Sequence, residues 1–255
     1  MTAVRRAGTQ VAKTLDRRHL SGALRLEHAT GAHASGYLAD LRAVGVALPD
    51  EITVTSHDGE IGVRHRWVEG TALRDLAASA PEEFVDATFQ IASWVDALRH
   101  TSSRLDTNLD NFVVDSADGR ITCVDVLPPI RTDLARTPAS PWQEIITGLC
   151  LDTDTTLCAL AGYAHRALTT TADTDLTSIT RAAVRSLCRG HSSNSLSADW
   201  FHSRLLASEH PEDPHARRLW DATSVSALIR TPPPARPARL ARALELIRTS
   251  PREHS

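Results

Sequence analysis

The chain of 255 residues is long enough for one large domain, or two lobes, with a buried core. Its formal net charge of −3 argues against wholesale nucleic-acid binding, and no apolar run reaches the roughly 18 residues of a membrane-spanning helix. The four cysteines show no CxxC pair and no metal-like spacing with histidine, and the N-terminal segment lacks the apolar run of a secretory signal. We therefore expect a cytoplasmic protein with reduced thiols.

The N-terminal segment holds two short runs typical of strands. Residues 10–15 and 23–27 are predicted to form them, and Gly8 would be the remnant of a phosphate-covering loop. Lys13 is the only lysine among 28 basic residues, so it is a candidate functional cation, although chance survival in an arginine-rich composition explains it equally well. A plain surface hairpin without a ligand is the alternative.

A helix and a hairpin are predicted next. Apolar residues at helical spacing predict a helix over residues 34–44, and Gly45 is a plausible stop after its last turn. Residues 52–55 and 61–67 flank an Asp-Gly turn at 58–59, which favours a β-hairpin.

A short linker and a long helix follow the hairpin. Val68, Glu69 and Gly70 resemble a connection between two lobes. Periodicity predicts an amphipathic helix over residues 81–99, with Pro81 in its first turn, where proline is tolerated. We expect its aromatic residues to belong to the core.

The most informative stretch is a second predicted hairpin that groups oxygen-bearing side chains. Asp106 precedes Asn111 by five residues, and a short apolar run follows. After a turn at residues 118–119, a second apolar run leads to Asp125. A hairpin would bring Asp125 back beside Asn111 and Asp106, a set of groups suited to Mg²⁺ and phosphoryl transfer. The alternative is a surface hairpin whose Asp and Asn residues are only turn formers.

The rest of the chain is predicted to be helical. Pro232, Pro233 and Pro234 break it before a basic final helix, whose arginines favour either an anionic partner or, more commonly, a solvated surface. A polar loop is expected at residues 191–194. The predicted helices are 142–151, 154–168, 175–189, 198–208, 216–230 and 238–248.

This order of elements resembles the aminoglycoside and choline phosphotransferase-like kinases, distant relatives of protein kinases. The resemblance covers roughly residues 8–168 and is most specific at the Asp106, Asn111 and Asp125 hairpin. It implies that Asp106 orients or deprotonates an acceptor hydroxyl, while Asn111 and Asp125 hold Mg²⁺. Arg104 and Leu105 stand where that family has His and Gly.

The resemblance also implies a nucleotide site. Arg25, within a Leu-Arg-Leu sequence, or else Lys13, would pair with the phosphates of ATP. The backbone of Arg66, Trp67 and Val68 would face the edge of the adenine ring.

One residue expected from the resemblance is missing. The family places a Glu near the start of the helix predicted at 34–44, and that position falls on Ala34. Asp40 and Glu27 are the nearest acids, and neither is aligned with it.

The sequence thus predicts an α+β, protein kinase-like two-lobed fold. Residues 1–69 would form a small β-rich nucleotide-binding lobe, and residues 70–255 a mostly helical lobe carrying the catalytic hairpin. The expected function is ATP- and Mg-dependent phosphoryl transfer to a hydroxyl of a small molecule or biosynthetic peptide. The alternative is a pseudokinase-type binding or scaffold protein. We expect neither nucleic acid nor membrane as a partner, and the oligomeric state stays open. We also expect that only Mg²⁺ and phosphates neutralise Asp125.

Overall fold

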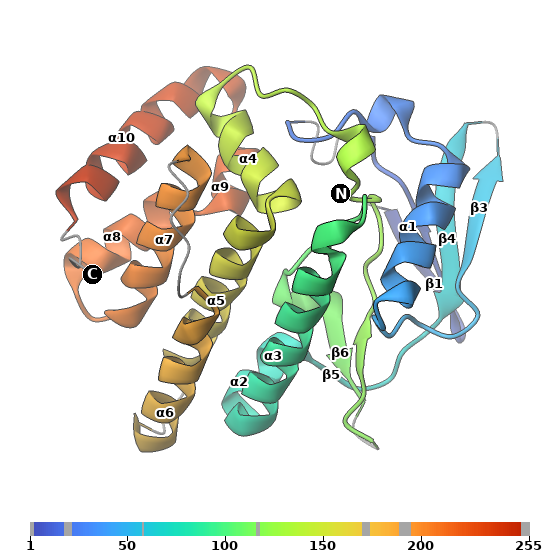
Figure 1. The fold of residues 1–255 in the computed structure, drawn as a ribbon, viewed down its shortest axis with the longest axis horizontal. Coiled ribbons are helices and arrows are strands. Elements are labelled where there is room, and N and C mark those ends of the chain that lie inside the picture. Colours follow the sequence, from blue (N-terminus) through green and yellow to red (C-terminus); the bar gives the residue numbers. More distant parts are fainter. Residues whose placement is uncertain are drawn as a thin grey trace.

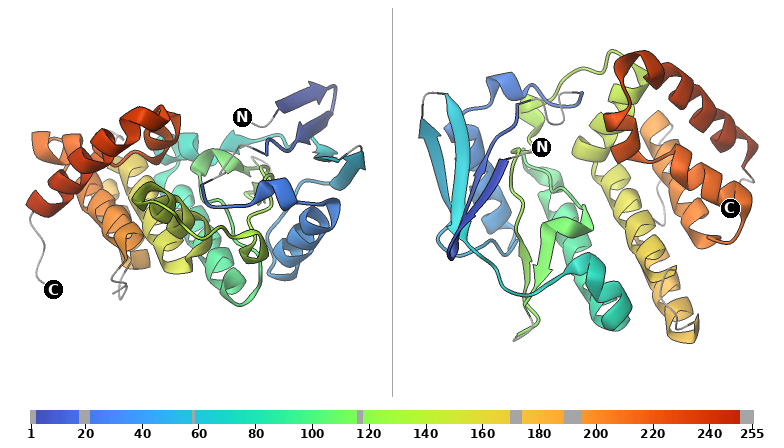
Figure 2. Two further views of the ribbon diagram at one scale, coloured as in Figure 1. Left: turned by 90° about the horizontal axis from the view of Figure 1, so that it is seen from above. Right: turned by 180° about the vertical axis from the view of Figure 1, so that it is seen from behind.

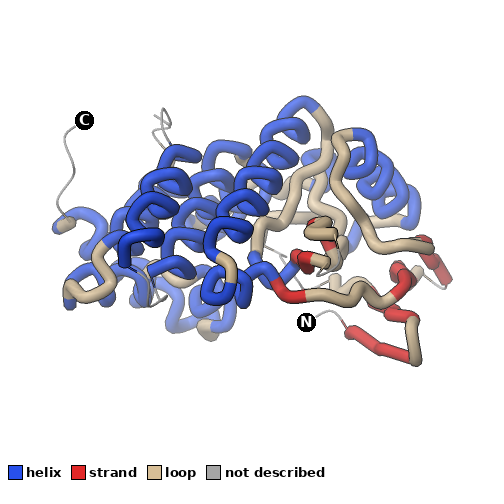
Figure 3. The backbone as a smooth tube through the Cα atoms, turned by 90° about the horizontal axis from the view of Figure 1, so that it is seen from below, coloured by secondary structure: helices blue, strands red, loops and turns tan. Residues whose placement is uncertain are grey.

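The computed structural model describes residues 3–17, 22–57, 59–115, 118–169, 174–188 and 195–250. The protein is α+β, with a small antiparallel sheet region and a mostly helical remainder. Figure 1 shows the strands on one side of the molecule and the C-terminal helices on the other. In Figure 3 the strands are gathered at one end of the backbone trace.

The N-terminal sheet has four antiparallel strands in the order β1-β2-β4-β3. They are β1 (Ala3–Ala7), β2 (Gln10–Thr14), β3 (Thr53–His57) and β4 (Glu60–Arg66). Helix α1 (Gly31–Ala43) packs against β3. The predicted hairpin of β3 and β4 is confirmed, although Asp58 of its turn lies outside the described residues, as does the predicted loop at 191–194.

The strand predicted at residues 23–27 is wrong. Leu24 forms only an isolated bridge with Ala135, and Leu26–His28 is a 3-10 turn. The N–H of Arg25 donates to the oxygen of Leu134 at 2.8 Å, so this segment pairs with a loop rather than with the sheet. The partners of β2 are instead β1 and β4.

Helix α1 begins three residues before its predicted start because a capping box fixes its N-terminus. The hydroxyl of Thr30 accepts from the His33 N–H, and His33 Nδ1 accepts from the Thr30 N–H at 3.1 Å. These two bonds satisfy donors that a helix leaves unpaired in its first turn.

A second, three-stranded sheet holds the predicted catalytic hairpin, in the order β5-β6-β7. Its strands are β5 (Thr71–Ala72), β6 (Phe112–Val114) and β7 (Ile121–Cys123). Helix α2 (Leu73–Ser79) leads into the long helix α3 (Pro81–Ala97), which confirms the helix predicted there.

The C-terminal helices pack side by side, as Figure 2 shows from two further directions. The helix predicted at 216–230 is in fact two helices, because the Ser224 hydroxyl accepts from the Ala227 N–H and starts a new one. No single described helix has the length and apolarity to cross a membrane; α4 and α5 pass that test only together, and they meet at 88°. The helices are α4 (Pro141–Leu151), α5 (Thr153–Thr169), α6 (Thr174–Arg185), α7 (Leu196–Glu209), α8 (Pro214–Ala222), α9 (Val225–Arg230) and α10 (Arg236–Thr249).

Helices α5 and α7 meet at a buried histidine. His165 is 3% exposed, and its Nδ1 lies 3.2 Å from the Ser208 oxygen, where an N–H at that nitrogen donates to the carbonyl. Burial lowers the pKa of His165 from 6.5 to about 4. The neutral form is therefore the one that the folded protein favours.

This burial predicts a loss of stability in mild acid. Because the unfolded chain binds the proton first, the contribution of His165 is present above pH 6.5 and is lost as the pH falls toward 4. Between pH 6.5 and pH 4 the free energy of unfolding should fall less in His165→Gln than in wild type, by roughly 2–3 kcal/mol. Urea denaturation at a series of pH values tests this. The exposed His28→Gln should keep the wild-type pH dependence, and an equal loss in all three proteins would contradict the prediction.

Gly70 brings the linker into close contact with β6. Its φ is +147°, and a Cβ there would overlap the Val114 oxygen and approach Val113 Cγ1 to 2.8 Å. A side chain is therefore excluded both by backbone conformation and by space.

We expect Gly70→Ala to lower the free energy of unfolding by roughly 2–3 kcal/mol, since it combines backbone strain with a clash against β6. Gly119 also has a positive φ, of +69°, but faces open space, so Gly119→Ala should cost only about 1 kcal/mol. Urea denaturation of both variants decides the matter. If both variants lose the same free energy of unfolding, the close contact between Gly70 and β6 does not add to the cost of a side chain there.

Candidate functional site

The hairpin of β6 and β7 brings Asn111 and Asp125 to the same end of the second sheet. Phe112 pairs with Cys123, and one step further the Val124 N–H donates to the Asn111 oxygen at 2.8 Å. Asp125 follows at once, so both residues lie at the same end of the hairpin. The side chain of Asn111 is buried, and that of Asp125 is 35% exposed.

Asp106 lies near the same place. Its Oδ1 accepts from the Asn108 N–H at 3.0 Å, which turns the loop toward the hairpin. Burial, and after it the carboxylates of Asp125 and Asp106, raise the pKa of Cys123 to about 12. The same two carboxylates raise the pKa of the buried Tyr37 phenol, after burial itself. Cys123 and Tyr37 therefore lie within electrostatic range of both carboxylates, and we call this region the centre of the candidate site.

Lys13 joins the N-terminal sheet to this centre. Its ammonium donates to the Val124 oxygen at 2.6 Å and lies 3.3 Å from Asp125 Oδ1. It sits on the covered face of β2 between Val11 and Leu15, and the residue is only 8% exposed. The expectation that only Mg²⁺ and phosphates neutralise Asp125 is wrong, because Lys13 already pairs with it.

Arg25 lies elsewhere. Its side chain is exposed, and its Nη2 reaches the Asp133 oxygen at 3.5 Å. Of the two candidate phosphate-binding cations, the structure brings Lys13 into contact with Asp125 and leaves Arg25 beside the loop of Asp133.

His65 is a member of this region that the sequence reasoning missed. It is 3% exposed, and its Nδ1 lies 2.7 Å from the Arg66 oxygen. Burial lowers its pKa, nearby Lys13 lowers it further, and Asp125 opposes them. The alternation of Ile61, Val63 and His65 along β4 was the available signal, since it puts His65 on the covered face.

Backbone N–H groups of the linker are already engaged in hydrogen bonds within the protein. The N–H of Arg66 donates to the Asp50 oxygen at 2.9 Å, and that of Trp67 donates to the Thr9 oxygen at 2.7 Å. The Trp67 ring lies 4.1 Å from the Arg6 guanidinium and is 39% exposed. Two of the three N–H groups expected at the adenine edge are therefore already bonded, and Val68 is the remaining one.

Helix α1 supports the loop before Asp106 and does not pair with Lys13. Asp40 Oδ2 accepts from the Ser103 hydroxyl at 2.6 Å and lies 3.5 Å from Arg131 Nη1. Within the described ranges, Lys13 has Asp125 as its carboxylate partner and none from α1. The acid of this helix thus fixes the loop rather than the lysine.

Arg104 anchors the same loop from the helical side. Its Nη1 donates to the oxygens of Leu98, Thr101 and Ser103 at 2.7–2.9 Å, and its Nε to the Leu151 oxygen at 3.0 Å. These carbonyls come from the end of α3, the following turn and the end of α4. One guanidinium therefore satisfies carbonyls of three segments just before Asp106.

We expect Arg104→Met to lower the free energy of unfolding by about 2–4 kcal/mol, because it removes charged donors from several half-buried carbonyls. Arg120, which is exposed, gives a matched control: Arg120→Met should change stability by less than about 0.5 kcal/mol. Urea denaturation measures both. A cost for Arg104→Met no larger than the control would exclude the anchoring role.

Asp110 stands apart from the other acids. Its carboxylate is exposed and pairs with Arg74 of α2 at 2.9 Å. Across the described part of the chain, no three His, Cys, Asp or Glu side chains cluster tightly enough to hold a metal by themselves. Any cation here would rely on Asn111, Asp125 and ligand oxygens.

No family model matches this chain, and no curated protein matches it either.

Proposed function

We propose that the protein is an ATP- and Mg²⁺-dependent phosphotransferase that acts on a hydroxyl of a small molecule or a peptide. In this proposal the kinase-like division holds, with residues 1–69 as the nucleotide-binding lobe and residues 70–255 as the lobe that carries the catalytic hairpin. The nucleotide would lie between the sheet and the hairpin, against Val68.

The observation that carries the proposal is the contact between Lys13 and Asp125, 3.3 Å apart. A lysine that is 8% exposed is costly to bury, and it is tolerated because Asp125 and the Val124 oxygen compensate it. The neighbouring hydrogen bond from Lys13 to Val124 spans 111 residues, from the N-terminal sheet to the hairpin. A phosphate-binding cation beside a metal-binding carboxylate is what phosphoryl transfer requires.

The residues fit the proposed ligands in donor chemistry. Asn111 and Asp125 offer the oxygen atoms that Mg²⁺ prefers. Lys13 would exchange Asp125 for phosphate oxygens, and Asp106 would orient the acceptor hydroxyl and accept its proton. When bound, ATP with Mg²⁺ supplies the phosphoryl group and neutralises its charge.

The alternative function is nucleotide or partner binding without transfer. One observation favours it: the N–H groups of Arg66 and Trp67 are bonded to Asp50 and Thr9, which leaves less of the linker for adenine. The second observation is that Lys13 has no carboxylate partner from α1 within the described residues.

Three Asp→Asn variants separate these functions. We expect Asp106→Asn to lower turnover at least about 100-fold while keeping the thermal stabilisation by ATP with Mg²⁺, because Asp106 acts on the acceptor. Asp125→Asn should lose both, because it would hold the metal. Asp110→Asn, whose carboxylate pairs with Arg74, should stay within about threefold of wild type.

The measurements are ATP turnover against a panel of hydroxyl acceptors and thermal unfolding with and without ATP and Mg²⁺. Stabilisation by ATP without turnover on any acceptor would favour the binding function. If ATP with Mg²⁺ leaves the unfolding temperature of wild type unchanged, the phosphotransferase is excluded.

A further inference from the structure

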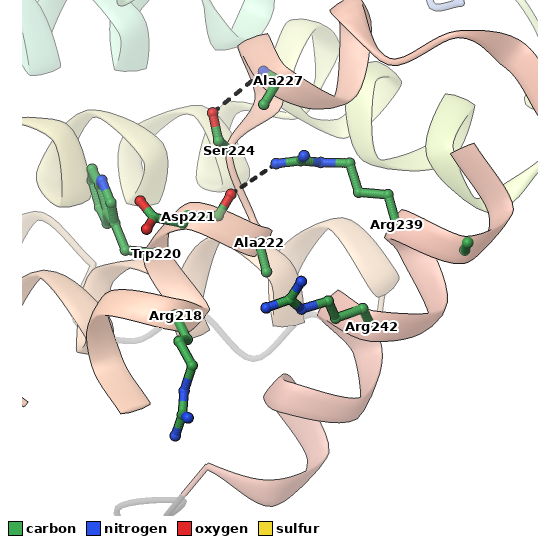
Figure 4. A pocket seen from close by; sticks show the side chains of 9 residues that line it. Arg218, Trp220, Asp221, Ala222, Ser224, Ala227, Arg239 and Arg242 are labelled. Carbon is green, nitrogen blue, oxygen red and sulfur yellow. Dashed lines mark hydrogen bonds between the residues drawn. The ribbon is translucent and has the colours of Figure 1, made fainter. Parts of the chain in front are cut away.

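Two hollows lie along α10. The first, of about 680 Å³, is lined by Arg218, Trp220, Asp221, Arg239 and Arg242 among others. It is drawn in Figure 4, where the arginines of α10 reach over the end of α8. Figure 1 shows α8 and α10 on the side of the molecule away from the N-terminal sheet.

The second hollow, of about 760 Å³, continues the first. It shares Ala238 and Arg242 with it and extends past Glu245 to Arg248. We call the two together the α10 groove. The α10 residues that line it run from Ala238 to Thr249, so the groove follows about 18 Å of helix, the length of about five residues of extended chain.

Some arginine side chains of this groove have donor groups without a bonding partner in the described part of the protein. Among the described residues, the side chains of Arg218 and Arg242 form no hydrogen bond or ion pair. Arg239 donates through Nη2 to the Asp221 oxygen at 2.8 Å, yet its buried Nε has no acceptor. Arg236 shows the contrast: it donates to the Thr231 oxygen at 2.9 Å and lies over the Trp142 ring. Arg236 has a structural role, Arg239 and Arg248 each bond a helix carbonyl, and the guanidiniums of Arg218 and Arg242 are available to a ligand.

The charged residues that line the groove are net positive, since Arg218, Arg239, Arg242 and Arg248 outnumber Asp221 and Glu245 and give a formal charge of +2. Residues 214–249 hold seven arginines and two acidic residues, which gives a formal charge of +5. The whole chain has −3, so the remaining residues carry −8. A basic surface on an otherwise acidic protein attracts anionic partners and directs them to one place.

The end of α8 under the groove is held rigidly. Trp200 Nε1 donates to the Thr223 oxygen at 2.9 Å, and Arg204 Nη1 donates to the Trp220 oxygen at 2.7 Å. The Arg204 guanidinium also lies 3.6 Å from the centre of the Trp220 ring. A floor that is already ordered loses little entropy when a ligand binds.

We propose that the α10 groove binds an acidic segment of a partner polypeptide in extended form. A lipid surface fits less well, because the apolar face of α10, Leu240, Ala243 and Ile247, is already buried in the protein. Single-stranded nucleic acid would need a row of aromatic platforms, and Trp220 is the aromatic residue that lines the groove. This proposal does not depend on phosphoryl transfer.

The test is fluorescence anisotropy with a labelled peptide of about eight residues, enough to span the groove, that alternates Glu and Gly. A peptide with Gln in place of Glu is the ligand control. The variant Arg218→Gln/Arg242→Gln should bind the Glu peptide about tenfold more weakly than wild type. The variant Arg42→Gln/Arg64→Gln removes two exposed arginines of α1 and β4, has the same net charge, and should bind within about twofold of wild type.

Several results would overturn the proposal. They are no binding of the Glu peptide, equal binding of the Gln peptide, and equal losses in the two double variants. Complete displacement by millimolar inorganic phosphate would mark a site for small anions only. Self-association of wild type that the groove variant abolishes would assign the groove to a second copy of the chain.

Discussion

The ion pair between Lys13 and Asp125 is the interaction on which the site depends. It joins the N-terminal sheet to the hairpin of β6 and β7, with Lys13 Nζ 3.3 Å from Asp125 Oδ1. Burial makes either charge costly without its partner. The pair therefore fixes the distance between a cation on β2 and the end of the hairpin, and every role that we assign to Asn111 and Asp106 presupposes that distance.

Two further anchors keep the loop before Asp106 in place. Asp40 of α1 accepts a hydrogen bond from the Ser103 hydroxyl. Arg104 donates hydrogen bonds to carbonyls at the end of α3, in the following turn and at the end of α4. The resemblance to phosphotransferases implied a His where Arg104 stands and an acid at the Ala34 position of α1. Here an arginine supports the loop through carbonyls, and the acid of α1 is used on the loop. These replacements explain how the loop is held without the residues that the resemblance implied.

The sequence predicted the elements whose signals are local. Helical spacing and Pro81 predicted α3, and turn residues predicted the hairpins of β3 with β4 and of β6 with β7. The structure contains all three. Leu24-Arg25-Leu26 alternates like a strand but pairs with a loop more than a hundred residues away, which no local pattern reveals. The break at Ser224 was hidden because a serine that caps a helix also occurs inside helices. Which cation meets Asp125 depended on strand parity and on the register of β2, and so needed the structure.

The central claim is that Lys13, released from Asp125, binds the phosphates of ATP. Calorimetric titration of ATP with Mg²⁺ into wild type, Lys13→Met and Arg25→Met tests it most directly, with circular dichroism to verify that each variant is folded. The account predicts that Lys13→Met weakens binding at least about tenfold, whereas Arg25→Met binds like wild type. Equal affinities for all three proteins, or a loss in Arg25→Met alone, would contradict it.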